Sequence, residues 1–413
     1  MGQWKQYKLG ELITLNSGGT PDKSNKSYWG GDIPWISAKF MYDDYLYSSE
    51  LKISQEGLDN GSRLAPKGSI LLLTRGSGLF NRIPVCYVMK DLAYNQDVKC
   101  IESNNKELVS TKFLFYWLMG NKNSIGAILE TTGIGAGKID TNRLKDIRIS
   151  LPPKEYQQAL IGFAESIMHK IELNRRINDN LEQQAQALFK SWFVDFEPFK
   201  DGKFVESELG MIPKGCRVGK AEDFYNINIG KTPPRKEQIW FSSNSSDYIW
   251  VSISDLGSCG RFVFASSEFL THEAIKRHNI ILVPKDTILL SFKLTIGRVG
   301  IAGTELTTNE AIARFITSDE NREYTYFLLK GYNYEKLGST SSIATAVNSK
   351  IIKAMVVLMP DKEILKAFSS LTKPYFDQIL RNEQESIRLT ILRDTLLPKL
   401  MSGELKINAT EVL

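Results

Sequence analysis

The chain has few of the side chains that build metal centres and disulfide frameworks. Its 413 residues include four cysteines and three histidines: Cys86, Cys100, Cys216 and Cys259, with His169, His272 and His278. The cysteines form no C-x-x-C pair, and three histidines are too few for a histidine-rich metal site. We therefore expect reduced thiols, no metal and no cofactor in this chain.

Long apolar runs are also missing. The longest, SILLL (69–73) and AMVVLM (354–359), have the size of β-strands and fall far short of the roughly 20 residues that a transmembrane helix needs. The N-terminal stretch MGQWKQYKLG lacks the apolar core of a signal peptide. The net charge of +5 is compatible with nucleic acid without identifying it. We expect a soluble, cytoplasmic protein with no membrane contact.

What the chain does contain is an internal repeat. Four stretches return in the same order and at similar offsets: SGGTP (17–21) as IGKTP (229–233), IPWIS (33–37) as YIWVS (248–252), APKGSILL (65–72) as VPKDTILL (283–290), and IDTNRLKDIRISLPPKE (139–155) as VNSKIIKAMVVLMPDKE (347–363). Each match alone is weak, but four in register indicate a duplicated architecture.

Each copy has two parts. Residues 1–150 and 201–358 mix short β-branched and aromatic runs with glycine, asparagine and serine, which predicts two mixed α/β heads. Residues 151–200 and 359–405 are rich in helix formers and carry prolines near their starts, which predicts two helical spacers. Residues 406–413 would form a C-terminal tail. The expected fold class is α+β, with two heads in a tandem pseudo-repeat joined by two long helices.

The two spacer helices show heptad spacing with a polar centre. The first seam runs from Leu160 to Trp192 and contains Asn174 and Asn178, and the second runs from Leu371 to Leu396 around Asn382. Matched lengths and matched polar layers favour an antiparallel coiled coil between the helices. The alternative is that each helix lies as an amphipathic helix on its own head.

These features resemble the specificity subunit of type I DNA restriction–modification enzymes. The resemblance is carried by GGTP and YWGGDIPWIS (18–37), by LPPKEYQQ and LMPDKE at the starts of the helices, by ELGMIPKG (208–215), and by LRDTLLPKLMSGEL (392–405). Two positions depart from it. Cys216 stands where the first copy has Trp4, and Pro360 is a single proline where the first copy has two.

The resemblance implies a non-catalytic subunit that recognises double-stranded DNA. Each head would be a target-recognition domain for one half of a bipartite, asymmetric site with a nonspecific spacer. The helices would hold two modification subunits, which bind S-adenosylmethionine and methylate adenine. Restriction subunits, which use ATP and Mg²⁺, would join this core.

Sequence patterns for catalysis are either absent or present in only one of the two copies. The pairs LPPK and TPPR lack the asparagine that precedes the prolines in an adenine methyltransferase loop. Asp22, Glu50 and Lys52 match a short nuclease pattern that could hold Mg²⁺, but the second copy has Arg235 in this region instead of a carboxylate. A self-sufficient nuclease or methyltransferase, and a coiled-coil protein whose heads bind protein, remain the alternatives.

The glycine-rich stretch TTGIGAGKID (131–140) is not a P-loop. Only three residues separate Gly133 from Gly137, and Ile139 follows Lys138 where a P-loop has a hydroxyl residue. We predict a flexible loop that contacts the DNA backbone through Lys138.

Candidate DNA contacts are cations and polar or aromatic residues in glycine-containing loops, because cations neutralise phosphates and polar side chains read base edges. Besides Lys138 they are Lys23, Lys26, Tyr28, Trp29, Ser37, Lys39, Arg75 and Arg82 in the first head, and Arg235, Lys236, Ser254, Lys293 and Arg298 in the second. The aromatic residues could instead anchor their loops in the core, and the glycine loops could be ordinary turns.

An aromatic cluster closes the first helix. Its members are Phe189, Trp192, Phe193 and Phe196. They cannot all face one coiled-coil seam. We expect a partner interface for a modification subunit, with packing against the second head as the alternative.

Overall fold

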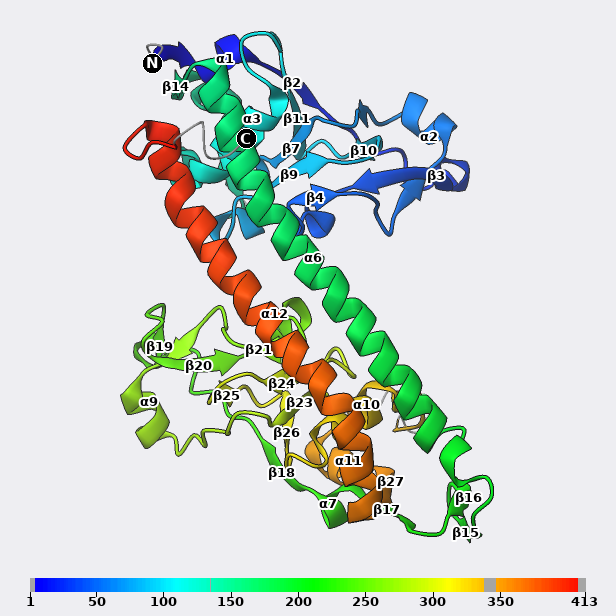
Figure 1. Ribbon diagram of the computed structural model, residues 1–413. Coiled ribbons are helices and arrows are strands. Elements are labelled where there is room, and N and C mark those ends of the chain that lie inside the picture. Colours follow the sequence, from blue (N-terminus) through cyan, green and yellow to red (C-terminus); the bar gives the residue numbers. More distant parts are fainter. Residues whose placement is uncertain (1–3, 134, 338–346, 408–413) are drawn as a thin grey trace. The chain divides into compact units, whose positions relative to one another are not determined.

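The computed structural model describes residues 4–133, 135–337 and 347–407, and divides into two compact units (Figure 1). Unit 1 comprises residues 1–171 and 388–413, and unit 2 comprises residues 172–387. Each unit therefore contains one head and a segment of each long helix. Among the described residues, no helix has the length and apolar character needed to cross a membrane.

Unit 1 is built on a five-stranded sheet in which only β4 and β9 run parallel. Its strand order is β2 (Ile13–Ser17), β11 (Val98–Ser103), β7 (Ile70–Leu73), β9 (Val85–Val88) and β4 (Tyr45–Leu46). A four-stranded sheet has the order β5 (Lys52–Ile53), β3 (Trp29–Ile36), β10 (Leu92–Tyr94) and β6 (Leu64–Ala65). Two small sheets complete the unit: β1 (Lys5–Lys8) with β14 (Arg148–Leu151), and β12 (Leu129–Thr131), β13 (Gly137–Ile139) and β8 (Arg75–Gly76).

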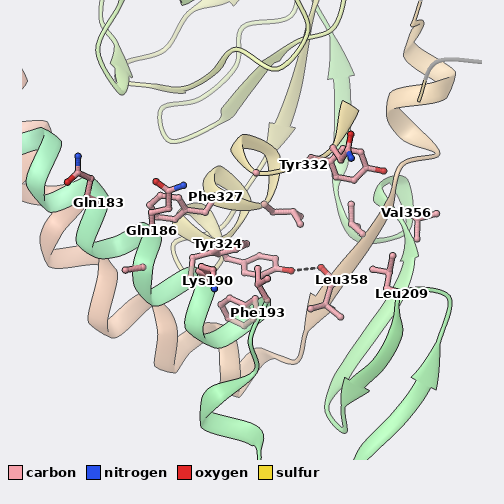
Figure 2. Close-up of a pocket in the computed structure, with 17 residues that line it drawn as sticks. Gln183, Gln186, Lys190, Phe193, Leu209, Tyr324, Phe327, Tyr332, Val356 and Leu358 are labelled. Atoms are coloured by element: carbon pink, nitrogen blue, oxygen red, sulfur yellow. Dashed lines mark hydrogen bonds between the residues drawn. The ribbon is translucent and has the colours of Figure 1, made fainter. Parts of the chain in front are cut away.

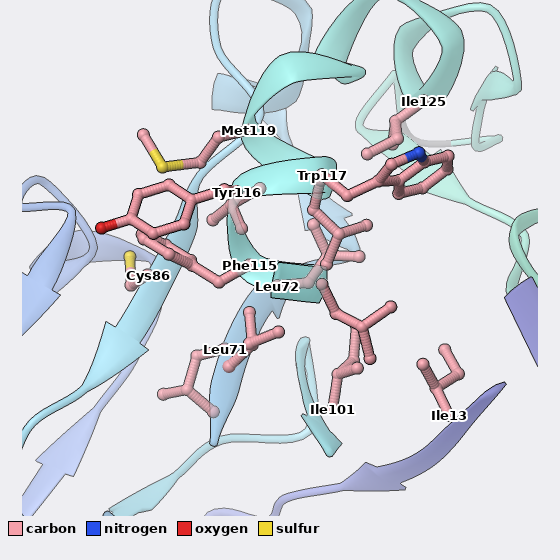
Figure 3. Packing of buried hydrophobic residues seen from close by; sticks show 14 of the residues in the cluster. Ile13, Leu71, Leu72, Cys86, Ile101, Phe115, Tyr116, Trp117, Met119 and Ile125 are labelled. Atoms are coloured by element: carbon pink, nitrogen blue, oxygen red, sulfur yellow. The ribbon is translucent and has the colours of Figure 1, made fainter. Parts of the chain in front are cut away.

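Helix α3 (Thr111–Gly120) packs in the core of unit 1 (Figure 3). Ser110 caps its N-terminus, because the Ser110 hydroxyl accepts a hydrogen bond from the Phe113 amide. Seven consecutive residues, Phe113 to Met119, are buried. The helix is therefore apolar on nearly every side and lies between the sheet and the long helices. The shorter helices are α1 (Leu9–Leu12), α2 (Gln55–Asp59), α4 (Lys122–Gly126) and α5 (Thr141–Asp146).

Unit 2 repeats the five-stranded sheet of unit 1, while its smaller sheets differ in their strands. Its five-stranded sheet has the order β18 (Asn226–Ile229), β26 (Ile312–Ile316), β23 (Ile288–Ser291), β24 (Val299–Ala302) and β21 (Phe262–Val263), and the last pair is again parallel. The second sheet is β19 (Phe241–Ser242), β22 (Phe269–Leu270), β20 (Tyr248–Val251) and β25 (Thr307–Thr308). Strand β17 (Cys216–Lys220) pairs with β27 (Val356–Pro360), and β15 (Phe204–Ser207) with β16 (Gly210–Pro213). The helices are α7 (Ala221–Phe224), α8 (Ile253–Ser258), α9 (His272–Arg277), α10 (Arg322–Lys330) and α11 (Ser349–Lys353). The expected α+β tandem repeat is confirmed.

The long helices are α6 (Lys154–Phe193) and α12 (Lys362–Ser402), and within each unit their segments run antiparallel. In unit 1, the Tyr156 hydroxyl donates to the carbonyl oxygens of Leu400 and Leu405 at 3.3 and 3.0 Å. In unit 2, Asn382 Nδ2 donates to Asn178 Oδ1 at 2.8 Å.

Asn174 completes the same buried polar layer in unit 2. Its Nδ2 donates to the carbonyl oxygen of Asn382 at 3.3 Å. Asn174, Asn178 and Asn382 are all less than 6% exposed. The layer therefore joins α6 and α12 through amide groups that are shielded from water.

The seam predicted for α12 is wrong by about one position. Leu371 and Leu392 are 47% and 44% exposed, whereas the adjacent positions Thr372 and Arg393 are buried, as is Leu397 next to the predicted Leu396. Asn382 lies on the predicted seam and is buried. The buried face of α12 is set by the head as well as by α6, because Phe368 belongs to the aromatic core of unit 2 and Leu397 to the core of unit 1. A heptad pattern counted along one helix takes no account of the contacts between that helix and the heads.

Candidate nucleic-acid interface

A tryptophan on the second sheet of each unit holds the repeated GGTP or GKTP turn. Trp35 Nε1 donates to the carbonyl oxygen of Gly19 at 3.1 Å, and Trp250 Nε1 donates to that of Lys231 at 3.0 Å. A Cβ on Gly230 would lie 2.0 Å from the carbonyl oxygen of Asn309. Glycine is required there by close backbone approach. The most recognisable motif of the sequence is therefore architectural.

Trp29 serves as an anchor for the loop after the first turn. Its indole nitrogen donates to the carbonyl oxygen of Asp22 at 3.1 Å, and its ring lies 5.3 Å from that of Trp35. The half-buried ring thus fixes a loop from which Lys23 and Lys26 extend into solvent, with Tyr28 half-buried beside them. The lysines are the members of this loop that are available to phosphate.

Arg235, a predicted DNA contact in the second head, is bound within its own unit. Both terminal nitrogens of its guanidinium lie 2.8 Å from the carboxylate of Glu268, and the group stacks over the rings of Phe241 and Trp250 at 4.4 and 4.6 Å. The hydrogen bonds that Arg235 donates to Glu268 raise the pKa of Arg235. A DNA phosphate would therefore have to compete with the Glu268 carboxylate for the Arg235 guanidinium. The neighbouring Lys236 is exposed.

In both units an arginine joins two loops that are distant in the sequence. Arg82 Nη2 donates to the carbonyl oxygens of Met41 and Tyr42 at 2.7 and 2.8 Å. Arg298 Nη1 donates to the carbonyl oxygen of Ile253 at 2.7 Å. Each arginine lies in the turn between equivalent strands, β7 and β9 or β23 and β24, and binds the segment that follows the tryptophan strand. In each head, the turn that contains the arginine and the segment after the tryptophan strand therefore form one surface.

The remaining predicted residues of these surfaces are mostly exposed. Lys39 follows the tryptophan strand in unit 1, with its Nζ 5.4 Å from the ring centre of Phe40, and Ser37 beside it is half-buried. Ser254 and Lys293 are exposed in unit 2. These side chains can reach a ligand without rearrangement of the fold.

The glycine-rich stretch 131–140 is part of a β-hairpin in unit 1, so the prediction of a flexible loop is wrong for most of it. Strands β12 and β13 pair directly, and Thr132 closes the turn through backbone and hydroxyl hydrogen bonds with Ala136. β13 also pairs with β8, which sets Lys138 opposite Arg75. The glycine content of the stretch could not predict that β13 pairs with β8, because β8 lies more than 50 residues away in the sequence.

Arg75 and Lys138 are like charges on neighbouring strands, an arrangement that is unfavourable without an anion. Glu130 lies across from Lys138 on β12, but its carboxylate binds Arg143 at 2.9 Å. Burial lowers the pKa of the nearby Lys99, and the charge of Arg75 lowers it further, while the charge of Asp97 acts in the opposite sense. The group is therefore suited to an external anion such as a DNA phosphate.

The aromatic cluster at the end of α6 lies mainly in the core of unit 2 (Figure 2). The Phe193 ring is 4.8 Å from Tyr324 and 5.0 Å from Phe368. Trp192 also packs on Phe368. These contacts fit the alternative of packing against the second head: Phe193 is buried, and Phe189, Trp192 and Phe196 are partly buried against the same core.

Phe189 and Phe193 also line a cavity of about 700 Å³. Tyr324, Phe327 and Leu358 form other parts of its wall, and the Tyr324 hydroxyl donates to the carbonyl oxygen of Leu358 (Figure 2). The lining is largely apolar and presents few polar groups that could orient a ligand. Nothing in this arrangement resembles a catalytic site.

Carboxylates and thiols form no catalytic or metal centre in the part of the chain that the structure describes. No group of three or more histidine, cysteine or acidic side chains there could hold a metal ion. Asp22, part of the nuclease-like pattern, accepts hydrogen bonds from the Ser24 amide and hydroxyl, which lower its pKa. All four cysteines are free, and burial raises the pKa of the Cys86 thiol to about 12. These thiols are poor nucleophiles.

The two heads share the strand order of their five-stranded sheet. In each head an arginine joins a pair of loops, and the head packs on segments of α6 and α12. The chain is therefore a tandem α+β protein with two equivalent candidate sites. The family model described as the type I restriction modification DNA specificity domain matches residues 1–183 and 213–389. The chain belongs to this family, and the resemblance seen in the sequence is confirmed.

Three relatives illustrate the similarity. The MjaIX specificity subunit of Methanocaldococcus jannaschii is 31% identical over 98% of this chain and 94% of that protein. The HindI specificity subunit of Haemophilus influenzae is 24% identical over 98% of this chain and all of that protein. The crystal structure of a type I restriction-modification S subunit from M. genitalium has a TM-score of 0.48 and 15% identity over 97% of this chain and 96% of that chain.

Proposed function

We propose that this chain is the DNA-recognition subunit of a type I restriction–modification complex. In this proposal, residues 1–150 and 201–358 each read one half of a bipartite, asymmetric site, and the bases between the halves are not read. The observation that carries it is the recurrence of an arginine-tied pair of loops in both units, at Arg82 and at Arg298. Membership of the family supports the same conclusion.

Cations on each loop surface would bind the phosphate backbone, while polar and apolar side chains between them would read the bases. Lys23, Lys26, Lys39, Arg75 and Lys138 serve the first head. Lys236, Ser254 and Lys293 serve the second. Arg82, Arg298 and Arg235 act mainly by fixing the loops, since their guanidinium groups already bind carbonyl or carboxylate oxygens.

The chemistry would be supplied by other subunits. Two modification subunits would bind S-adenosylmethionine and methylate adenine, and restriction subunits with ATP and Mg²⁺ would cleave. These partners would bind the helical spacers, and the complex would be cytoplasmic. The absence of a repeated carboxylate set in the two heads supports a non-catalytic role for this chain.

An exchange of heads tests the proposal. Residues 1–150 are replaced by the corresponding head of another family member, and the chain is reconstituted with its modification subunit. Sequencing of methylated adenines should show that one half of the site changes while the other half stays. A site that is unchanged, or one that changes in both halves, contradicts the assignment of one half-site to each head.

The rival function is a self-sufficient nuclease or methyltransferase. The purified chain is incubated with plasmid, Mg²⁺ and S-adenosylmethionine, and cleavage and methyl transfer are measured. We expect neither reaction. Reproducible activity that is lost in Asp22→Asn but kept in Asp32→Asn, a change at an exposed carboxylate of β3, would establish the enzyme instead.

A further inference from the structure

The turn between β23 and β24 in unit 2 carries a leucine that is entirely in solvent. Leu294 is 101% exposed and has a φ of +59°, a left-handed conformation that its Cβ disfavours. The turn itself is well held. Ser291 Oγ donates to the Thr295 carbonyl oxygen at 2.6 Å and accepts from the Arg298 amide at 3.1 Å. The leucine is therefore presented to solvent by an ordered turn.

The equivalent turn in unit 1, between β7 and β9, also presents an apolar side chain. Phe80 ends the short helical turn Ser77–Phe80 and is 51% exposed. Two residues later, Arg82 holds the carbonyl oxygen of Tyr42, whose ring is 68% exposed. The two heads differ in sequence and turn length here, yet both place a large exposed apolar group in the turn between equivalent strands.

Cations lie beside each apolar group. Lys293 precedes Leu294 and is exposed, whereas Arg298, four residues further on, holds the carbonyl oxygen of Ile253. In unit 1, Arg75 begins the turn, and Lys138 lies opposite Arg75 on the neighbouring strand. A single apolar side chain among cations is unlike a protein–protein contact, which buries on the order of 1,200–2,000 Å² in total. It suits duplex DNA, where phosphates border grooves that display the apolar methyl group of thymine.

We propose that Leu294 and Phe80 are base-reading side chains of the two heads. Each enters a groove of the duplex and packs on base edges, with the thymine methyl as the matching group, while the adjacent cations bind phosphates. Burial against DNA compensates for the unfavourable backbone of Leu294 and for its exposure in the free protein. This inference rests on the proposed function and adds the residues that select bases.

The test uses the full chain with its modification subunit and a library of random-sequence duplex DNA. Selection by the wild-type protein defines the two half-sites. Leu294→Gly removes the side chain and suits the positive φ, so it should not weaken folding. Phe80→Ala makes the corresponding change in unit 1. Met211→Ala, at a 57% exposed position of β16 outside these turns, is the matched control.

Each turn variant should lose discrimination at one or two positions of one half-site, by about tenfold in relative affinity, and should keep the other half. The control should match the wild type. Unchanged base preference in both folded variants overturns the inference while the proposed function stands. Weaker binding of the modification subunit with unchanged base preference also overturns it, in favour of a protein contact. If the wild type selects no sequence at all, the proposed function fails and the inference falls with it.

Discussion

Arg393 on α12 lies with its Nη1 atom 2.8 Å from Oδ2 of Asp44, the residue just before β4 in unit 1. The equivalent position in unit 2, just before β21, is Arg261, and its guanidinium binds Asp179 and Glu182 of α6 at 2.5 and 2.8 Å. Both units thus fasten the edge of the sheet to a long helix by an ion pair, and the charges are reversed between them. A head with the wrong charge at this position would meet a like charge on the helix.

The first prediction concerns the pair in unit 1. Asp44→Ala leaves the Arg393 side chain, which is 6% exposed, with Asp394 as its remaining carboxylate partner. We expect a loss of about 2–3 kcal/mol in the free energy of unfolding, because a buried charge loses a partner. The double variant Asp44→Arg with Arg393→Asp should recover part of this loss. Thermal and urea unfolding measure both effects.

The control for this prediction is Lys8→Ala. Lys8 binds Asp146 at 2.8 Å, but both side chains are more than half exposed, so no measurable change is expected. Equal effects of Asp44→Ala and Lys8→Ala would show that burial of Arg393 does not matter to stability.

The second prediction concerns the polar layer between α6 and α12. Asn382→Ala removes the donor to Asn178 Oδ1 in a buried setting. We expect unit 2 to lose about 1–3 kcal/mol, the usual cost of an unsatisfied buried polar atom. Gln186→Ala, at an exposed position of α6, is the control. Unfolding followed by circular dichroism should separate the variants, and coincident curves would argue against a structural role for this layer.

The third prediction is a pH dependence centred on Glu182. Burial by itself would raise the pKa of this carboxyl, but hydrogen bonds from Lys330 and Tyr326 and the charge of Arg261 outweigh burial and hold the pKa below its usual value of 4.5. A group with a lowered folded pKa contributes stability above its unfolded pKa and loses that contribution as pH falls through the folded pKa. Stability due to Glu182 should therefore be complete at neutral pH and disappear below about pH 4.5.

The measurement is the difference in unfolding free energy between wild type and Glu182→Gln across pH 3–8. Glu383 acts in the opposite sense, because burial raises its pKa and the charge of Glu182 adds to the rise. We expect a constant difference above pH 5 that narrows toward acid. A difference that grows as the pH falls would contradict the assigned direction.

The fourth prediction concerns Lys138, which lies opposite Arg75 on β8. Lys138→Ala should weaken DNA binding by the reconstituted complex and reduce the slope of log affinity against log salt by about 1, the loss of one phosphate contact. Base preference and thermal stability should stay unchanged. Lys145→Ala, an exposed residue of α5, should leave the slope as it is. Identical slopes for both variants would remove Lys138 from the interface.

Several features could be predicted from the sequence because they depend on neighbours along the chain. The repeat, the two long helices and the polar layer follow from order and spacing, and the structure buries Asn174, Asn178 and Asn382 together. The buried face of α12 could not be predicted to the residue. Its apolar positions lie on both sides of the helix, and packing of Phe368 and Leu397 against the heads decides which side is covered.

In the candidate site, too, the sequence predicted some features and tertiary packing decided others. Composition predicted loops at Arg82 and Arg298, and the structure places both residues in turns between strands. It could not assign roles to individual cations. Arg235 is neutralised by Glu268, which lies 33 residues away, and Arg82 is held by carbonyl groups about 40 residues away.

The sequence by itself determined that this protein is a duplicated α+β chain of the type I DNA specificity family, because repeats, periodicity and motifs are local in the chain. Only the tertiary structure decided which side chains are available to a ligand. Availability depends on partners brought together by strand pairing and packing, as when β8 and β13 set Arg75 beside Lys138 while Glu268 neutralises Arg235.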